Sequence, residues 1–384
     1  MKKFIAVAIV LVMIVAICAS SAKMIFAYDG NLQIEMYDGS SARGLCVLEG
    51  HTNTILYGKN LHKKMAMAST TKIITGILAI EHFEDLDTVI TVDDSACGIE
   101  GTSIYLNYGE EISIRNLLYG LILASGNDSA TALGIAVSGS EEAFVSHMNE
   151  FAARVGAINT SFDNAHGLDS KTHYTTPYDL ALITSYAMKN DVFKEVVSTQ
   201  TKHVPGTQKS GERYLRNKNK LTFTQNNNVG VKTGFTDDAG RCLVNAVEQD
   251  DMQIITVVLN CGPMFEEARN YTNTALKNYK MHTLITPYTY IGNIMVESGD
   301  KPNVNVVSVK GYKIPILKEE LEKYRVEYDL PEILTAPVNL DEEIGRAKVY
   351  KNDDLIFETA LYSIDEVKNV DFKTMVDNII EHWF

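Results

Sequence analysis

The sequence is poor in the residues that build metal sites and covalent scaffolds. Its 384 residues include 5 cysteines, 8 prolines and 1 tryptophan. The cysteines are scattered and neither C-x-x-C nor H-E-x-x-H occurs, so a zinc site or a disulfide-stapled fold has little support. Basic residues are fewer than acidic ones, and the resulting formal net charge of −14 argues against a nucleic-acid partner. With 45% hydrophobic residues the chain is too apolar for disorder, and its length predicts a large domain plus a smaller one.

The first 27 residues predict a secretory signal peptide. Lys2 and Lys3 precede an apolar run over 4–18, and small residues follow. This is the charged start, hydrophobic middle and small-residue exit of an export signal, with cleavage expected after Ala27 or, as the second choice, after Ala22. An uncleaved membrane anchor is the alternative interpretation, but the run of about 15 residues is shorter than the ~20 that span a bilayer.

Hydrophobic periodicity predicts an α+β domain over residues 28–283. Strand patterns occur near both ends of this stretch, at 42–48, 54–57, 229–231, 241–247 and 252–259. Between them, apolar residues recur at helical spacing in five segments: 73–80, 117–122, 129–137, 142–155 and 178–188. Strands at both ends with helices between them predict one antiparallel sheet, closed by distant segments, with a helical subdomain inserted.

The residue pattern of the sequence changes near residue 284. Short β-leaning segments separated by turn residues predict a small all-β domain over 284–365. Residues 366–384 then carry an apolar stripe at the spacing of one helix face: Met375, Val376, Ile379, Ile380, Trp383 and Phe384. Tryptophan favours membrane interfaces, so we expect an amphipathic helix in peripheral contact with the cytoplasmic membrane. The alternative is a helix docked on the β-domain, favoured by the acidic residues on its polar face.

The first of three short motifs, Ser69-Thr70-Thr71-Lys72, opens an apolar helix. Three residues make nearly one helical turn, so the Ser69 hydroxyl and the Lys72 amine lie on one face and can meet. An N-cap serine with an incidental lysine is the competing interpretation, although a lysine in the first turn opposes the helix dipole by about 0.3–1 kcal/mol. Burial, the dipole and a second cation all lower the pKa of an amine, and a neutral lysine can serve as general base for serine.

The other two motifs are Ser125-Gly126-Asn127, in a break between helical segments, and Lys232-Thr233-Gly234, on a predicted strand. A plain helix–helix turn with its caps explains the first motif when it is taken alone. An edge strand protected by a lysine explains the second. In a functional interpretation, Lys232 and Thr233 hold an anionic substrate end, while Gly234 lets the substrate backbone lie along the strand.

Together, S-x-x-K, S-x-N and K-T-G follow the order and rough spacing of penicillin-recognising serine enzymes. Five segments closely resemble the D-alanyl-D-alanine carboxypeptidases, the low-molecular-weight penicillin-binding proteins: 67–75, 125–128, 164–168, 231–236 and 239–243. The family often has proline where Met67 stands. The resemblance is strong over about residues 40–280, and it implies a β-lactamase/transpeptidase-like domain followed by the β-domain.

The resemblance implies a role for the residues of the first two motifs. Ser69 attacks the carbonyl of the penultimate D-alanine in a peptidoglycan stem peptide, and Lys72 accepts its proton. Ser125 relays a proton to the departing amine, and Asn127 holds the substrate amide. An acyl-enzyme forms, terminal D-alanine leaves, and water hydrolyses the ester.

The resemblance also implies how the substrate is held. Lys232 keeps the site positive, and Thr233 binds the terminal carboxylate, with Arg216 as an additional candidate. The oxyanion hole is expected at the backbone N–H groups of the nucleophile and of Phe235, which follows Gly234. No metal and no organic cofactor is implied.

The resemblance favours a carboxypeptidase that is exported to the outer face of the cytoplasmic membrane or the cell wall and that β-lactams acylate. One alternative is a D,D-endopeptidase that cuts cross-links, although such enzymes often lack the extra β-domain. A class A β-lactamase would need a Glu-x-x-x-Asn between Ser125 and Lys232, and none is found there. A non-catalytic wall-binding protein on the same fold is disfavoured by three intact motifs. His166 and Asp179 lie in family-like segments and are expected to be structural.

Overall fold

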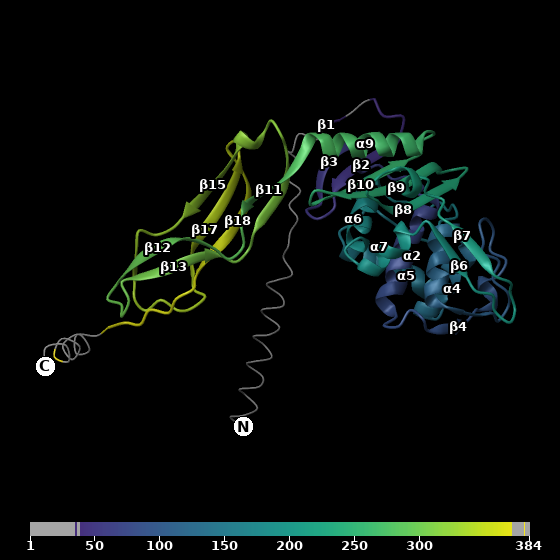
Figure 1. The fold of residues 1–384 in the computed structure, drawn as a ribbon, viewed down its shortest axis with the longest axis horizontal. Coiled ribbons are helices and arrows are strands. Elements are labelled where there is room, and N and C mark those ends of the chain that lie inside the picture. Colours follow the sequence, from purple (N-terminus) through teal and green to yellow (C-terminus); the bar gives the residue numbers. More distant parts are fainter. Residues whose placement is uncertain (1–34, 37–38, 371–379, 381–384) are drawn as a thin grey trace, which may run out of the picture. The chain divides into compact units, whose positions relative to one another are not determined.

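The computed structural model describes residues 35–36, 39–370 and 380. The expected signal peptide at 1–27 and most of the expected terminal helix at 366–384 lie outside these residues. Among the described residues, no helix is both long and apolar enough to cross a membrane. The described chain contains an α+β domain and a β-rich C-terminal domain, which confirms the predicted fold class (Figure 1).

A six-stranded sheet forms the centre of the first domain, in the order β1-β3-β2-β10-β9-β8. Its strands are β1 (Glu35–Met36), β2 (Gly44–Glu49), β3 (Thr54–Lys59), β8 (Asn228–Thr236), β9 (Gly240–Gln249) and β10 (Met252–Leu259). Apart from the parallel pair β1 and β3, neighbouring strands run antiparallel. Glu49 of β2 pairs with Ile254 of β10, so distant segments close the sheet as the sequence predicted.

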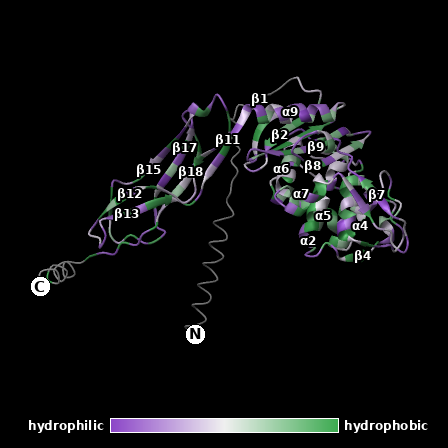
Figure 2. Ribbon diagram, viewed as in Figure 1, coloured by the Kyte–Doolittle hydropathy of each residue, from purple (hydrophilic) through white to green (hydrophobic). Residues whose placement is uncertain are grey.

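Helices cover this sheet. The helix α9 (Met264–Asn278) packs against it through a cluster that includes Leu45 of β2, Ile254 of β10 and Ala268 of α9 itself. The inserted helices lie on the other side of the sheet in Figure 1, and α6 contacts both β2 and β10. They are α2 (Lys72–His82), α3 (Ile114–Tyr119), α4 (Asn127–Ser138), α5 (Glu141–Arg154), α6 (Pro177–Ala187) and α7 (Asp191–Ser198). The short α8 (Leu221–Thr224) packs with α9 instead, since Leu221 belongs to the same apolar cluster. Figure 2 shows α2 and α4 as strongly hydrophobic, in keeping with their burial.

Local sequence signals start several of these elements. Ser140 caps α5 by accepting a hydrogen bond from the Ala143 amide, and Thr176 caps α6 just before Pro177. The β9–β10 hairpin turns through Asp250 and Asp251, both with positive φ (49° and 63°), which suits a two-residue hairpin loop. By contrast, α2 begins without a side-chain cap and with Lys72 in its first turn.

Two small hairpins, which the sequence did not predict, lie among the helices. One pairs β4 (Val89–Thr91) with β5 (Glu111–Ser113), and the other pairs β6 (Thr201–Val204) with β7 (Arg213–Arg216). The segment that leads from β4 towards β5 approaches the predicted site. β7 precedes the strand that carries the third motif.

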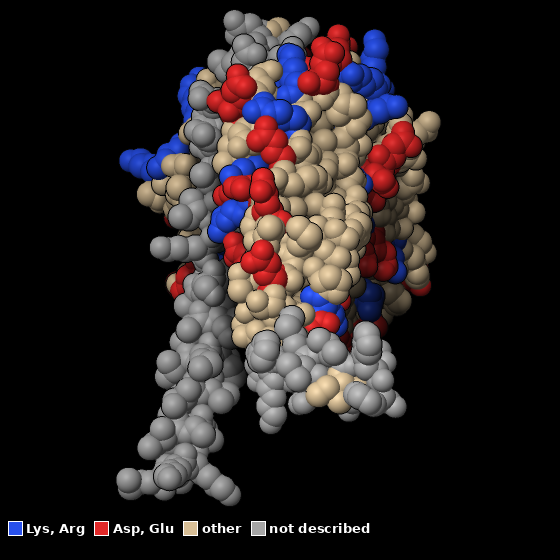
Figure 3. Space-filling model, turned by 90° about the vertical axis from the view of Figure 1, so that its left-hand side faces the viewer, with Lys and Arg blue, Asp and Glu red and all other residues tan. Residues whose placement is uncertain are grey.

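The C-terminal domain has a six-stranded sheet in the order β15-β17-β18-β13-β12-β16, together with the pair β11 and β14. These strands are β11 (Tyr279–Ile285), β12 (Thr289–Glu297), β13 (Asn303–Ser308), β14 (Tyr312–Leu317), β15 (Tyr324–Asp329), β16 (Ile333–Thr335), β17 (Glu343–Lys351) and β18 (Asp354–Ser363). Their buried side chains form a separate apolar core around Val304, Val306, Ala347, Val349 and Leu361. Figure 3 shows a face over this domain whose centre is uncharged, with charged side chains mainly along its edges.

One predicted boundary is corrected by the structure. Residues 366–370 do not open a helix, because Val367 and Asn369 form β-bridges with Val338 and Gly299. Val367 is fully buried in the core of the β-domain. The β-domain therefore continues beyond residue 365, because a buried valine from this segment completes its core.

Candidate active site

Ser69 lies in a short 3-10 turn, η1 (Ala68–Thr71), that leads directly into α2. Thr71 Oγ1 donates to the Ala68 carbonyl (2.9 Å), and Ala68 itself has a left-handed φ of 49°. Gly167, with φ of 96°, packs so closely that a Cβ there would stand 2.0 Å from the same carbonyl oxygen. The turn that carries Ser69 is thus shaped by a threonine hydroxyl and by a glycine from a distant loop. Ser69 stays partly exposed although its neighbours are buried.

The Lys72 side chain is fully buried and its amine is surrounded by hydrogen-bond acceptors. Nζ donates to Ser69 Oγ (2.9 Å), Asn127 Oδ1 (2.7 Å) and the backbone carbonyl of His166 (2.7 Å). All three acceptors are neutral groups, so no carboxylate pairs with this amine. The lysine in the first helical turn is thus held by hydrogen bonds, one of them to the hydroxyl of the adjacent serine.

Electrostatics favour a neutral Lys72. Burial lowers the pKa of Lys72 well below its usual range, the positive charges of Lys232 and Lys218 lower it further, and the Asp128 carboxylate opposes them weakly. Burial, followed by the charge of Lys218, lowers the pKa of Lys232 to about 7. At neutral pH, Lys72 can therefore accept a proton, whereas Lys232 is partly charged.

The second motif lies where two helical segments meet. The π-helical turn η3 (Gly120–Ala124) ends at Ser125, whose φ of 64° places its hydroxyl towards the third motif, where it accepts from Lys232 Nζ (2.9 Å). Asn127 opens α4 and is buried. Its Oδ1 accepts from Lys72, and its Nδ2 donates to the Glu100 carbonyl (2.5 Å). The second motif, which the sequence alone explains as a plain turn, thus hydrogen-bonds to both Lys72 and Lys232.

The third motif lies on β8 against the turn that carries Ser69. Lys232 is 1% exposed, and its amine donates to Ser125 Oγ and to the Thr233 carbonyl (2.8 Å). A Cβ on Gly234 would stand 3.0 Å from both the Met67 carbonyl oxygen and the Ser69 nitrogen. We expected this glycine to make room for substrate backbone; in the structure it makes room for the turn that carries Ser69. It also brings β8 beside the Ser69 amide, one of the two expected oxyanion donors.

Two predicted residues lie apart from these hydrogen bonds. Arg216 is on β7, with its guanidinium carbon 4.3 Å from the centre of the Phe223 ring, and no hydrogen bond joins it to another predicted site residue in the part of the chain that the structure describes. The side chain of Phe235 is 63% exposed, while its backbone continues β8 opposite Arg241. The cation whose charge reaches both buried lysines is Lys218, which sequence reasoning missed.

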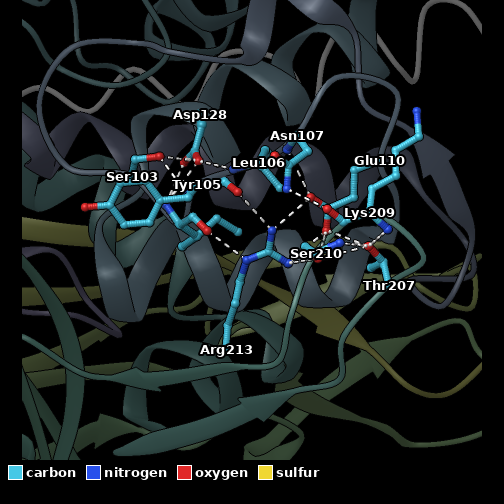
Figure 4. A network of polar contacts seen from close by, with 11 residues as sticks. Ser103, Tyr105, Leu106, Asn107, Glu110, Asp128, Thr207, Lys209, Ser210 and Arg213 are labelled. Carbon is cyan, nitrogen blue, oxygen red and sulfur yellow. Dashed lines mark hydrogen bonds and ion pairs between the residues drawn. The ribbon is translucent and has the colours of Figure 1, made fainter.

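A loop after residue 99 also contributes to the site, and sequence reasoning missed it. Thr102 accepts at its carbonyl from the Asn127 amide (2.7 Å), and its hydroxyl donates to the Ser125 carbonyl (2.5 Å). The buried Asp128 carboxylate accepts from the amides of Ile104 and Leu106 and from the Ser103 hydroxyl (Figure 4). Most of these contacts use backbone atoms, which leave no residue pattern in a sequence. The aspartate next to the second motif was the one available signal.

The two residues expected to be structural have structural contacts. The buried His166 ring accepts from the Leu168 amide (3.3 Å), and burial, followed by the charge of Lys72, lowers its pKa to about 3. Asp179 accepts from the Asn159 amide (2.7 Å) and the Thr160 hydroxyl (2.9 Å). His166 nevertheless touches the site through its backbone, since its carbonyl accepts from Lys72.

Comparison with known proteins covers both domains. A family model described as D-alanyl-D-alanine carboxypeptidase (Peptidase S11) matches residues 33–262, and one described as penicillin-binding protein 5, C-terminal domain, matches residues 279–369. The D-alanyl-D-alanine carboxypeptidase DacC of Escherichia coli K12 is 30% identical over 86% of this chain and 85% of its own. DacF of Bacillus subtilis 168 is 28% identical over 92% of both chains.

Solved structures have a similar fold. Penicillin-binding protein 5 from Haemophilus influenzae superimposes with a TM-score of 0.73, at 24% identity, over 87% of this chain and 99% of its own. The DD-transpeptidase of Streptomyces K15 gives a TM-score of 0.57 at 29% identity, over 62% of this chain and 96% of its own. The first likeness extends through the β-domain, whereas the second is confined to a shorter part of the chain.

Proposed function

Because this chain belongs to the D-alanyl-D-alanine carboxypeptidase family of serine peptidases, we propose that it removes the terminal D-alanine from peptidoglycan stem pentapeptides through an acyl-enzyme on Ser69. The observation that carries the proposal is the pair of hydrogen-bonded serines and buried lysines, Ser69 with Lys72 and Ser125 with Lys232. A partly exposed serine beside a neutral, buried amine is an activated nucleophile.

Acylation follows from these contacts. The neutral Lys72 amine takes the proton from Ser69 Oγ as that oxygen bonds to the carbonyl carbon of the penultimate D-alanine. The oxyanion that forms is stabilised by the backbone N–H groups of Ser69 and Phe235. As the C–N bond breaks, Ser125, hydrogen-bonded to Lys232, gives its proton to the leaving amine and takes up the proton that Lys72 had accepted.

Substrate binding uses the third motif and the amide of the second. Lys232 and Thr233 hold the terminal carboxylate, and Asn127 holds the substrate amide while keeping Lys72 in place. Arg216 joins the carboxylate only if its side chain leaves the ring of Phe223. Carboxylate binding next to Lys232 favours the protonated amine, so substrate itself sets the charge state that binds it.

The same geometry argues against a β-lactamase. The Lys72 amine is bonded to a hydroxyl, an amide oxygen and a backbone carbonyl, and the segment around His166 offers it a backbone oxygen instead of a carboxylate. A β-lactam therefore acylates Ser69 without a carboxylate base beside Lys72 to speed hydrolysis of the ester. We expect a long-lived covalent adduct.

Two measurements on the purified protein test the proposal. A fluorescent β-lactam should label the parent but not Ser69→Ala, and label that persists on Ser69→Ala would rule out this nucleophile. Free D-alanine should be released from a pentapeptide. Cleaved muropeptide dimers without D-alanine release would instead support the endopeptidase.

We further propose that the enzyme is exported and that its last residues contact the cytoplasmic membrane. The charged and apolar pattern of residues 1–27 supports export, and the apolar stripe within 371–384 supports the contact. Because Val367 and Asn369 belong to the β-domain, a clean deletion starts at residue 371. That deletion should release acylatable enzyme from membrane pellets. Enzyme that stays in the pellet with its signal peptide removed would overturn the membrane contact.

A further inference from the structure

The loop that contacts the second motif is held from its other side by one arginine. Arg213, on β7, donates from Nε to the Ile104 carbonyl (2.7 Å) and from Nη2 to the Tyr105 carbonyl (3.1 Å). Its guanidinium also makes a two-point ion pair with Glu110, both contacts being 2.8 Å (Figure 4). The Glu110 side chain is fully buried and that of Arg213 is 10% exposed.

The carboxylate of this pair also accepts hydrogen bonds from other groups. Besides Arg213, Glu110 accepts from the Asn107 amide (3.1 Å) and the Ser210 hydroxyl (2.8 Å). A buried, bidentate arginine–carboxylate pair with further hydrogen bonds has a fixed geometry. It joins the loop over 103–110 to the hairpin that precedes the strand of the third motif.

Packing holds the loop only in part. Ile104 and Leu106 are buried, whereas a cavity of about 760 Å³ borders the far end of the loop at Gly109. Tyr105 is 82% exposed and has a left-handed φ of 59°. A bulky residue keeps such a backbone conformation only where its surroundings impose it. Here the hydrogen bonds from Arg213, together with those to Asp128, impose it.

We propose that Arg213 is a positioning residue for acylation: by holding the carbonyls of Ile104 and Tyr105, it fixes the loop that hydrogen-bonds to Ser125 and Asn127. This inference rests on the proposed function. Arg213 holds the carbonyls of residues 104 and 105, and residues 103, 104 and 106 hydrogen-bond to Asp128, which follows Asn127 in the chain. Thr102, which precedes this loop, hydrogen-bonds to Asn127 and Ser125. Displacement of reacting groups by about 1 Å can cost roughly 10²-fold in rate.

The decisive variant is E110Q/R213Q. Replacing both partners leaves no unpaired buried charge, so we expect the fold to be retained while the fork to the two carbonyls is lost. We expect full labelling by a fluorescent β-lactam, with an acylation rate constant roughly 10- to 100-fold below that of the parent. A purely structural role would lower the labelled fraction instead of the rate constant. R115Q is the matched control, because Arg115 makes a similar fork with exposed Asp87 (2.8 and 3.2 Å), and its rate should not change.

R213K covers the case in which the double variant does not fold. Lysine keeps the charge beside Glu110 but cannot reach two carbonyls and a carboxylate together. Its acylation should be slowed while its thermal midpoint stays near that of the parent. A parent-like rate constant in E110Q/R213Q, or in R213K, overturns the role of Arg213. A parent protein that takes no label overturns the proposed function itself.

Discussion

The two domains of this molecule bury different kinds of side chain. In the α+β domain the buried residues include Glu49, Lys72, Glu110, Asp128 and Lys232. In the described part of the β-domain, the buried polar side chains are uncharged: Ser308, Thr359 and Ser363. Its ion pairs lie on the surface instead, as between Lys348 and Asp329 or Arg346 and Glu358.

The difference shows which domain buries ionisable side chains for its chemistry, at a cost in stability. A buried amine is unfavourable unless hydrogen bonds and neutralisation compensate for lost hydration. The catalytic domain buries two such amines beside Ser69 and Ser125, and each of them donates to one backbone carbonyl, that of His166 or that of Thr233. The β-domain has an apolar core and a charged surface, which is what stability alone requires. Four experiments test this contrast, in order of expected effect.

Removing a buried amine should have the largest effect. Lys72→Ala is expected to slow β-lactam acylation about 10²–10⁴-fold, because a general base is lost. Stopped-flow labelling measures the rate constant. Lys348→Ala removes a lysine of the β-domain and should leave it unchanged. A near-normal rate in Lys72→Ala would move the base role elsewhere, with Ser125 the next candidate.

Two glycine-to-alanine substitutions compare how tightly the surroundings constrain the backbone in the two domains. Gly167→Ala adds a Cβ at a positive φ and against the Ala68 carbonyl, so we expect a loss of at least about 1–3 kcal/mol in the free energy of unfolding. A Cβ on Gly292, in β12, meets nothing within 4 Å. Gly292→Ala should therefore stay within about 0.5 kcal/mol of the parent. Urea unfolding separates the two, and equal losses would contradict the contrast.

The pH dependence of acylation should report the buried lysines. With the pKa of Lys232 at about 7, its charge is present below that pH and lost as pH rises through it, so kcat/KM should fall on the alkaline side. Lys218→Gln removes a like charge, which raises the pKa of Lys232 and moves this limb upward by roughly 0.5–1 pH unit. Lys220→Gln is the control. A downward shift, or an equal shift in the control, would refute the coupling.

The smallest effect is expected at the surface of the β-domain. Arg346 pairs with Glu343 and Glu358, both at 3.2 Å, and all three side chains are substantially exposed. Exposed ion pairs are screened by water and salt. Arg346→Gln should change neither the thermal midpoint nor the acylation rate within error. A clear loss of stability would show that the surface charges of this domain matter more than its core.

Much of the fold could be predicted from the sequence. The central strands and the helices α2, α4, α5 and α6 have clear periodicity, and the structure confirms them. The hairpins β4–β5 and β6–β7 have three or four residues per strand, too short for a pattern to stand out. The end of the β-domain was also missed, because one buried valine, Val367, decides it.

The site also contains groups that the sequence predicts and groups that it does not. Serine, lysine, asparagine and threonine side chains in three motifs were predictable because the chemistry needs those residue types. The carbonyls of Glu100, Thr102 and His166 were not, since any residue supplies a carbonyl and only the fold decides where it lies. Lys218 was missed because its charge acts through space, without a hydrogen bond that a motif would record.

The pairing of β2 with β10 joins two segments that the ribosome makes at well-separated times. A ribosome adding about 5–20 residues per second makes Glu49 roughly 10–40 s before Ile254, its partner in the sheet. For most of that interval the turn that carries Ser69 has been synthesised, but β8, which packs against it, has not. A chain that terminates between Thr71 and β8 therefore contains Ser69 but lacks the Lys232-Thr233-Gly234 motif.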